Sequence, residues 1–294
     1  MDIVGRKKWF LSVTAIYILV AVFLTAVFGL KSGIEFSSGS ILTLNFEKEM
    51  GQSELKQALA RAGYPGAIVQ LTSKGDFIVR TPELTSEAKT ALESALGGEL
   101  GEVKEVEFKS VSPMIAAETT RNTIIAVVVA SFGIMLYLAW AFRQMPSPFL
   151  YGVGAVIALA HDSLVSIGVF SLLGRFYNWE INLMFIMGIL AVIGYSVNNT
   201  VVVFDRIREN ATRGLSRDFD TLVNYSISET LGRCINTSLT TLIMILALLL
   251  FIGSTIRNFA VVLMVGLIAG TFSSSFLAPL LLVLWQKKKE ADTD

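Results

Sequence analysis

Cysteine, histidine and charge are all scarce in this sequence of 294 residues. The single cysteine, Cys234, cannot form an intrachain disulfide, so cysteine usage says nothing about the redox compartment. The single histidine, His161, has no cysteine nearby, which argues against a metal centre. The formal net charge is zero, so no basic excess points to nucleic acid. Because phosphate-binding glycine loops and nucleophile motifs are also missing, we expect neither enzymatic activity nor a cofactor.

Apolar residues, in contrast, dominate the composition. Hydrophobic residues make up 53% of the chain and charged residues 16%, whereas soluble proteins average about 25% charged residues. This composition predicts an integral membrane protein. Six segments are apolar and long enough to cross about 30 Å of hydrocarbon. They are residues 9–30, 122–142, 147–174, 181–204, 234–256 and 258–285. The first is too long for a signal peptide and lacks a small-residue cleavage site, so we expect it to be retained.

Basic residues in the short connecting segments indicate the orientation. They cluster at 6–8, 143, 206–217 and 287–289, all on one side of the predicted spans. The positive-inside rule therefore predicts that both termini are cytoplasmic. The expected divisions are an N-terminus with the first span at 1–30, a five-helix membrane region at 119–286 with a cytoplasmic loop at 205–233, and a cytoplasmic tail at 287–294. Within the loop, residues 218–233 could form an amphipathic helix that lies near the membrane surface and leads into the fifth span at Arg233.

Residues 31–118 depart from the membrane pattern and lie between the first and second spans. Alternating apolar residues predict strands at 41–46, 67–72, 76–81 and 103–111, with a turn at 73–75 joining the middle pair. Helical patterns occupy 52–62 and 85–96, the latter with Thr85 as a cap and Gly97 and Gly98 as its end. The order β-α-β-β-α-β is that of a ferredoxin-like domain. The predicted fold is an α-helical membrane protein, a half-bundle of six transmembrane helices with one α+β ferredoxin-like external domain.

Polar side chains concentrate in the inner half of the fourth span. The cluster consists of Ser196, Asn198, Asn199 and Thr200. Polar groups in lipid need hydrogen-bond partners, so we expect the cluster to face other helices. The residues either belong to a functional site or simply hold helices together.

Two further features could carry ion coupling. His161 and Asp162 form an ionisable pair in an apolar span, where a charge costs at least about 2.5–3.5 kcal/mol. The pair is either functional or a structural link between the third and fourth spans. Arg233 opens a ladder on one helical face, followed by Asn236 or Thr237 and then by Thr240 or Thr241, and this ladder could face Asn199. Alternatively, Arg233 lies at the cytoplasmic interface as an ordinary positive-inside residue.

Charged residues follow the fourth span directly. They are Asp205, Arg206, Arg208 and Glu209. We expect an exposed helix end with local ion pairs, which would act in docking rather than in proton transfer.

The chain contains several long motifs, of which the strongest is GYSVNNTVVVFDRIREN at 194–210. This motif resembles the fourth-span signature of the SecF family, the smaller membrane subunits of the SecDF protein-export complex. GIEFSSG at 33–39 is similar to the element after its first span, and His161-Asp162 matches its His-Asp pair. The pattern from Asn224 through Arg233 to Ser238 resembles its fifth-span signature. The resemblance covers essentially the full length.

The resemblance implies a function in Sec-dependent export. Members of this family work with SecD near the SecYEG channel, use the proton or sodium gradient, and belong to the resistance-nodulation-division superfamily. The implied partners are SecD, SecYEG, YajC and translocating unfolded polypeptide, and the implied location is the cytoplasmic membrane. Proton or ion coupling would involve Asn199, Asp162, Arg233 and His161, supported by the polar face of the fourth and fifth spans.

One departure from the family pattern concerns Asn199, where most members have an aspartate. Asparagine has nearly the same shape as aspartate, but its amide group cannot titrate. Either SecD supplies the titrating carboxylate, Asp162 takes over part of the duty, or the sequence carries a deliberate charge-removing substitution. Two other functions stay open: a small-molecule or lipid exporter of the same superfamily, and a non-transporting assembly factor of the translocon.

Overall fold

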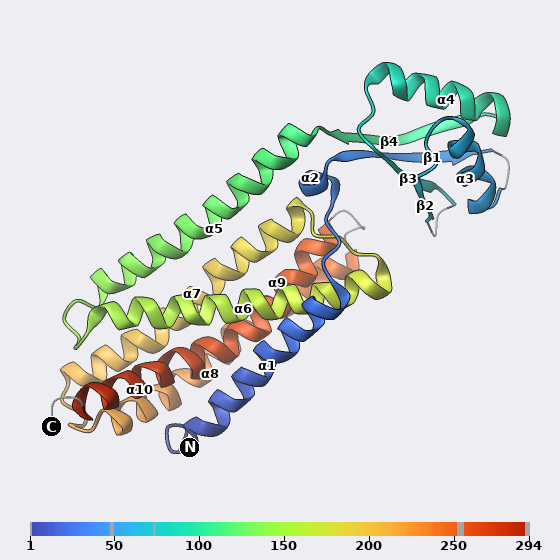
Figure 1. Cartoon of the computed structure of the whole chain (residues 1–294). Coiled ribbons are helices and arrows are strands. Elements are labelled where there is room, and N and C mark those ends of the chain that lie inside the picture. The colour runs from blue at the N-terminus through green and yellow to red at the C-terminus, as the bar shows by residue number, and fades with distance from the viewer. Residues whose placement is uncertain (1, 48–49, 73–74, 252–255, 292–294) are drawn as a thin grey trace. The chain divides into compact units, whose positions relative to one another are not determined.

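The computed structural model describes residues 2–47, 50–72, 75–251 and 256–291, with side chains up to residue 287 (Figure 1). Part of the predicted turn at 73–75, the end of the fifth predicted span and the last tail residues lie outside these ranges. The chain divides into two compact units. One comprises Met1–Lys31 and Ile124–Asp294, and the other Ser32–Thr123.

The smaller unit is built on one four-stranded antiparallel sheet. After the short helix α2 (Ile34–Ser37) come β1 (Gly39–Phe46), α3 (Gln52–Arg61), β2 (Ile68–Leu71), β3 (Phe77–Thr81), α4 (Ser86–Leu100) and β4 (Val103–Val111). The strand order in the sheet is β2-β3-β1-β4, with β1 paired to both β3 and β4. Leu42 and Leu44 of β1 pack with Leu55 of α3 and Leu96 of α4 in one apolar core.

Helix α4 begins as the sequence predicts and ends later. The Thr85 hydroxyl accepts a hydrogen bond from the Ala88 amide at 3.3 Å, which confirms the predicted cap. The predicted end at Gly97 and Gly98 is wrong, because the helix continues to Leu100 and stops before Gly101, whose φ is +96°. Each glycine in a helix costs about 1 kcal/mol, and burial of the Leu100 side chain in the core offsets this cost and stabilises the extra turn.

The larger unit consists of long apolar helices. They are α1 (Lys7–Phe28), α5 (Pro113–Ala141, whose first residues belong to the smaller unit), α6 (Pro148–Tyr177), α7 (Leu183–Thr212), α8 (Phe219–Phe251), α9 (Arg257–Phe272), the π-helical η2 (Ser273–Leu277) and α10 (Ala278–Ala291). The last three form one continuous apolar span, Arg257–Lys287. Among the described residues, six helices are long and apolar enough to cross a membrane, which confirms the predicted number of spans.

Helix α8 is one continuous helix rather than two. The Asp218 carboxylate caps its start by accepting hydrogen bonds from the Thr221 hydroxyl at 2.6 Å and the Thr221 amide at 2.9 Å, and these bonds lower the pKa of Asp218. The helix then passes Arg233 without a break. The predicted helix at 218–233 is therefore confirmed from Phe219 onward, as the first part of the fifth-span helix. Val223 and Ile227 are fully buried in the core of the helical unit, so protein rather than lipid headgroups covers their apolar face.

The start of α8 also anchors the chain's first residues. Ile3 is fully buried, and its amide donates to the Asn224 side-chain oxygen at 2.7 Å. One turn earlier, the Asp220 carboxylate pairs with Lys7 of α1 at 3.5 Å and with Lys287 of α10 at 2.6 Å. These contacts hold one end of α1, α8 and α10 together.

Candidate functional site

His161 and Asp162 of α6 form a buried pair that contacts α7. Their side chains are 1% and 0% exposed, and His161 Nδ1 lies 2.9 Å from Asp162 Oδ1. The Ser196 hydroxyl of α7 donates to the other carboxyl oxygen, Asp162 Oδ2, at 2.6 Å. Helix α9 also approaches closely, since a Cβ atom on Gly270 would lie 3.2 Å from Asp162 Oδ2. The pair therefore links the third and fourth spans at a point where three helices meet.

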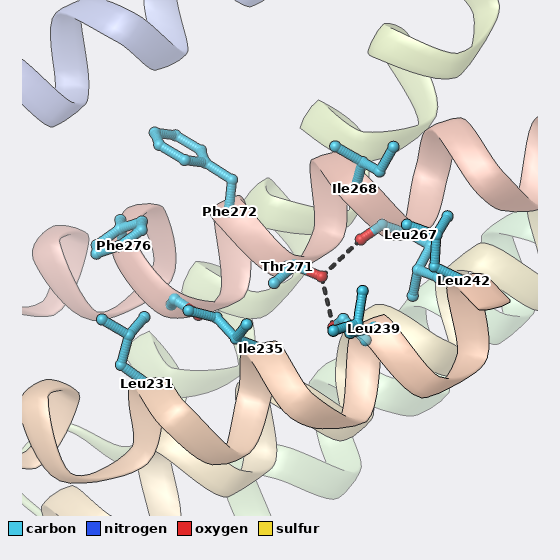
Figure 2. A pocket seen from close by; sticks show the side chains of 11 residues that line it. Leu231, Ile235, Leu239, Leu242, Leu267, Ile268, Thr271, Phe272 and Phe276 are labelled. Carbon is cyan, nitrogen blue, oxygen red and sulfur yellow. Dashed lines mark hydrogen bonds between the residues drawn. The ribbon is translucent and has the colours of Figure 1, made fainter.

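Asn199 occupies a second polar contact, between α7 and α8. Its Nδ2 donates to Ser238 Oγ at 3.2 Å, and both side chains are buried. The Tyr195 hydroxyl also donates to Ser238 Oγ, at 3.4 Å, and Thr271 Oγ1 of α9 lies 2.6 Å from the same atom (Figure 2). Ser238 is thus the common partner of residues from α7 and α9.

The expected ladder on α8 does not face Asn199. Arg233 and Thr240 are exposed and Thr237 is half-buried. The Thr237 hydroxyl donates to the Arg233 carbonyl at 2.8 Å, and Thr240 donates to the Thr237 carbonyl at 2.9 Å. That prediction is wrong because the buried face of α8 carries Cys234 and Ser238, one residue further along.

The polar cluster of the fourth span divides between two faces of α7. Ser196, Asn199 and Thr200 are buried, and the Thr200 hydroxyl donates to the Ser196 carbonyl at 3.1 Å. Asn198 is exposed on this chain, so the expectation that the cluster faces other helices is confirmed within the chain for the other three residues and stays a prediction for Asn198. Its side chain points away because it lies two residues after Ser196, about 200° around a helix of 3.6 residues per turn.

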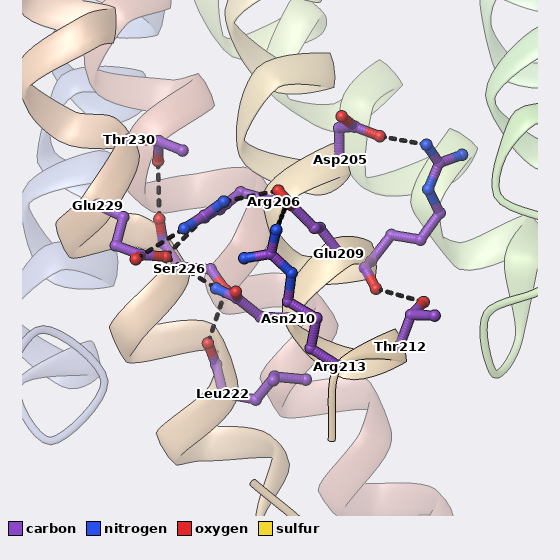
Figure 3. Close-up of polar contacts among 11 residues, drawn as sticks. Asp205, Arg206, Glu209, Asn210, Thr212, Arg213, Leu222, Ser226, Glu229 and Thr230 are labelled. Atoms are coloured by element: carbon purple, nitrogen blue, oxygen red, sulfur yellow. Dashed lines mark hydrogen bonds and ion pairs between the residues drawn. The ribbon is translucent and has the colours of Figure 1, made fainter. Parts of the chain in front are cut away.

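The charged end of α7 forms the predicted local ion pairs. Arg206 Nη1 lies 2.6 Å from Glu209, and Arg208 pairs with Asp205 (Figure 3). Arg206 has a second acidic partner, Glu229 of α8, which was not predicted from the sequence. The contact with Glu229 is bidentate: Arg206 Nε donates to Glu229 Oε2 at 2.6 Å, and Nη2 donates to Oε1 at 2.8 Å.

Asn210 extends this contact between α7 and α8. It is 2% exposed, and its Nδ2 lies 3.0 Å from Ser226 Oγ and 2.9 Å from Glu229 Oε2 (Figure 3). A helical register carried unbroken from residue 219 would have placed Ser226, Glu229 and Ser238 near α7.

A mainly apolar groove of about 360 Å³ runs between α8 and the α9–η2 segment (Figure 2). Its walls include Ile235 and Leu239 on one side and Ile268 and Phe272 on the other. Ser238 and Thr271, which bond to each other, supply hydroxyl groups to its lining. For metals, the described residues hold no group of three or more histidine, cysteine, aspartate or glutamate side chains that could bind an ion.

Six apolar helices joined by buried imidazole, carboxyl, amide and hydroxyl contacts define a multi-pass membrane protein with a polar interior. Residues 92–288 match the family model described as protein export membrane protein SecD/SecF, C-terminal. The chain belongs to this SecD/SecF family.

Related proteins match the chain over nearly its full length. The protein translocase subunit SecF of Thermobaculum terrenum is 40% identical, over 98% of this chain and 95% of that protein. The SecF subunit of Anaerolinea thermophila is 36% identical, over 97% and 94% of the two chains. The crystal structure of SecDF from Thermus thermophilus, a translocon-associated membrane protein, superimposes with a TM-score of 0.82 at 34% identity. That match covers 98% of this chain but 39% of the SecDF chain.

Proposed function

We propose that this chain is a SecF-type subunit that works with SecD in Sec-dependent protein translocation across the cytoplasmic membrane. The observation that carries the proposal is the near full-length similarity to proteins named protein translocase subunit SecF. In the Thermus SecDF protein, the region similar to this chain is joined to a longer remainder. A separate SecD chain would supply that remainder here.

The proposed driving force is the proton or sodium gradient, coupled through Asp162, His161, Asn199 and Arg233. In favour of this assignment, Asp162 and His161 are buried ionisable groups in a membrane helix, and Asn199 joins α7 to α8. Moving one charge through the membrane potential yields roughly 2.3 kcal/mol per 100 mV, enough to shift a conformational equilibrium. The work would be mechanical, with helix packing against SecD as the part that changes.

We assign the smaller unit to the external side as a ferredoxin-like domain, with both termini cytoplasmic. Its element order and its β2-β3-β1-β4 sheet support the fold assignment. The basic residues at 6–8 and 287–289 support the orientation. The external domain would contact SecD or unfolded substrate, near SecYEG and YajC.

A translocation assay tests this function. Membrane vesicles containing SecYEG and SecD are compared with and without this chain, each with an intact gradient and with an uncoupler. We expect the chain to speed import of a preprotein several-fold, and the uncoupler to abolish that gain. Stimulation that survives the uncoupler would instead indicate a non-transporting assembly factor. A rate that never depends on the chain would contradict the proposal.

A further inference from the structure

The carboxyl group of Asp162 is the feature that demands an explanation beyond helix packing. It has no exposure and lies in α6, one of the helices that are long and apolar enough to cross a membrane. An ionised carboxylate there is costly unless a cation or a proton neutralises it. The potential cation in hydrogen-bond contact with it is the imidazole of His161, at 2.9 Å. Together the two groups are neutral when they hold one titratable proton between them.

The far side of the imidazole is left without a partner. His161 Nε2 is buried and makes no hydrogen bond to any described residue. Buried polar atoms are nearly always satisfied, so an orphaned ring nitrogen points to a group that arrives there, such as a water molecule or a proton. Nδ1 faces Asp162 while Nε2 faces away, so a proton could enter the ring at Nε2 and leave it at Nδ1.

We propose that His161, Asp162 and Ser196 form a proton-binding site, with Asp162 as the acceptor and His161 as the relay. In the unloaded state, Asp162 is a carboxylate that accepts hydrogen bonds from His161 Nδ1–H and from the Ser196 hydroxyl. A hydronium ion gives up one proton to Nε2: its O–H bond breaks, an N–H bond forms on the ring, and a water molecule is left. The Nδ1–H bond then breaks as an O–H bond forms at Asp162 Oδ1. The loaded state is a neutral carboxylic acid beside a neutral imidazole protonated at Nε2.

No fixed charge competes for this proton among the described neighbours of the pair. From α1, Tyr17 approaches, its ring 6.4 Å from the imidazole. From α7 the facing group is Ser196, and from α9 it is Gly270, which has no side chain. The η2 serines Ser273 and Ser274 bond to carbonyl groups of their own helix. Loading therefore changes the charge of the site from −1 to zero.

The change reaches α7 directly through Ser196. In the unloaded state its hydroxyl donates to Asp162 Oδ2 at 2.6 Å, and neutralising the carboxylate weakens this charge-assisted bond. Ser196 lies one turn before Asn199, which holds α8 through Ser238. A coupling role for this site rests on the proposed gradient-driven function, but proton binding itself does not.

The test is spectroscopic and uses the full chain in phospholipid vesicles of defined composition, in sodium-free buffer. Infrared difference spectra between acidic and alkaline pH report carboxylic acid C=O bands. Because the chain has one histidine, isotope-labelled histidine gives a single imidazole signal in solid-state magnetic resonance. We expect a C=O band that appears on acidification and is lost in Asp162→Asn. In parallel, the ring proton should move from Nδ1 to Nε2. His161→Gln should keep the band but slow its appearance after a pH jump.

The matched control is Ser166→Ala. Ser166 is as buried as the pair and donates to the Asp162 backbone carbonyl at 2.9 Å, but its hydroxyl does not bond to the carboxyl group. It should leave the band unchanged. Difference spectra that are the same for the unchanged chain and for Asp162→Asn would overturn the proton site even if translocation depends on the gradient. A normal band with gradient-independent translocation would instead reject the proposed function and keep the site.

Discussion

Gly168→Leu is expected to separate α1 from α6 and to lower the melting temperature of the protein substantially. A Cβ atom on Gly168 would lie 2.6 Å from Ala21 Cα and 3.0 Å from Ala21 O. Both are backbone atoms, so no side chain can rotate away and one helix must move. Overpacking of this kind typically costs about 1–3 kcal/mol. We expect the leucine variant to lie at the upper end, because it adds a whole branched side chain.

The same helix pair is also held by a hydrogen bond that depends on close approach. The Ser171 hydroxyl of α6 donates to the Leu24 carbonyl of α1 at 3.0 Å, and separation of the helices would break it. Thermal unfolding in detergent measures the effect. Gly194→Leu is the control, because a Cβ atom there meets nothing within 4 Å. Equal melting temperatures for the two variants would show that the close crossing does not stabilise the protein.

Asn199→Asp is expected to add a pH-dependent step to translocation. Asn199 is 1% exposed, and its amide donates to Ser238 Oγ at 3.2 Å. An ionised aspartate cannot donate, so the Ser238 hydroxyl would have to turn and donate to it. A charge at this depth costs about 2.5–3.5 kcal/mol, which favours either protonation or an approach of Arg233. The variant should therefore respond to both pH and the gradient more steeply than the natural sequence.

The measurement is the translocation rate across a series of pH values in vesicles that also contain SecD. The control that separates the charge from the lost hydrogen bond is Asn199→Ala, which removes the amide group without adding a carboxyl group. Only Asn199→Asp should acquire the steeper profile. If its profile matches that of the natural sequence, residue 199 has no direct part in coupling.

The spans could be predicted from the sequence because hydrocarbon imposes a simple requirement. A helix that crosses the membrane needs an unbroken apolar stretch, and composition alone reveals it. Helix ends are less predictable, as α4 shows, because burial of Leu100 favoured two glycines in the helix. The sequence contained that leucine but gave no sign that it would reach the core.

The hydrogen-bond partners of the buried polar side chains were less predictable than the spans. His161 and Asp162 are neighbours in sequence, so their pairing was apparent, whereas Ser196 joins them only through the packing of α6 on α7. Likewise, Arg233 rather than Ser238 was expected to lie near Asn199. The two positions differ by five residues on one helix, and a small error in helical register exchanges a buried position for an exposed one.

The central claim is that a second subunit covers polar side chains that this chain leaves exposed within its membrane helices. Asn198 of α7 and Asn236 of α8 are such residues. The most direct measurement places a photo-crosslinking amino acid at each position in intact membranes that contain SecD, with Val129 of α5, 62% exposed, as the apolar control. We predict adducts with SecD from both asparagine positions and lipid adducts from Val129. Lipid adducts alone from all three positions would contradict the account.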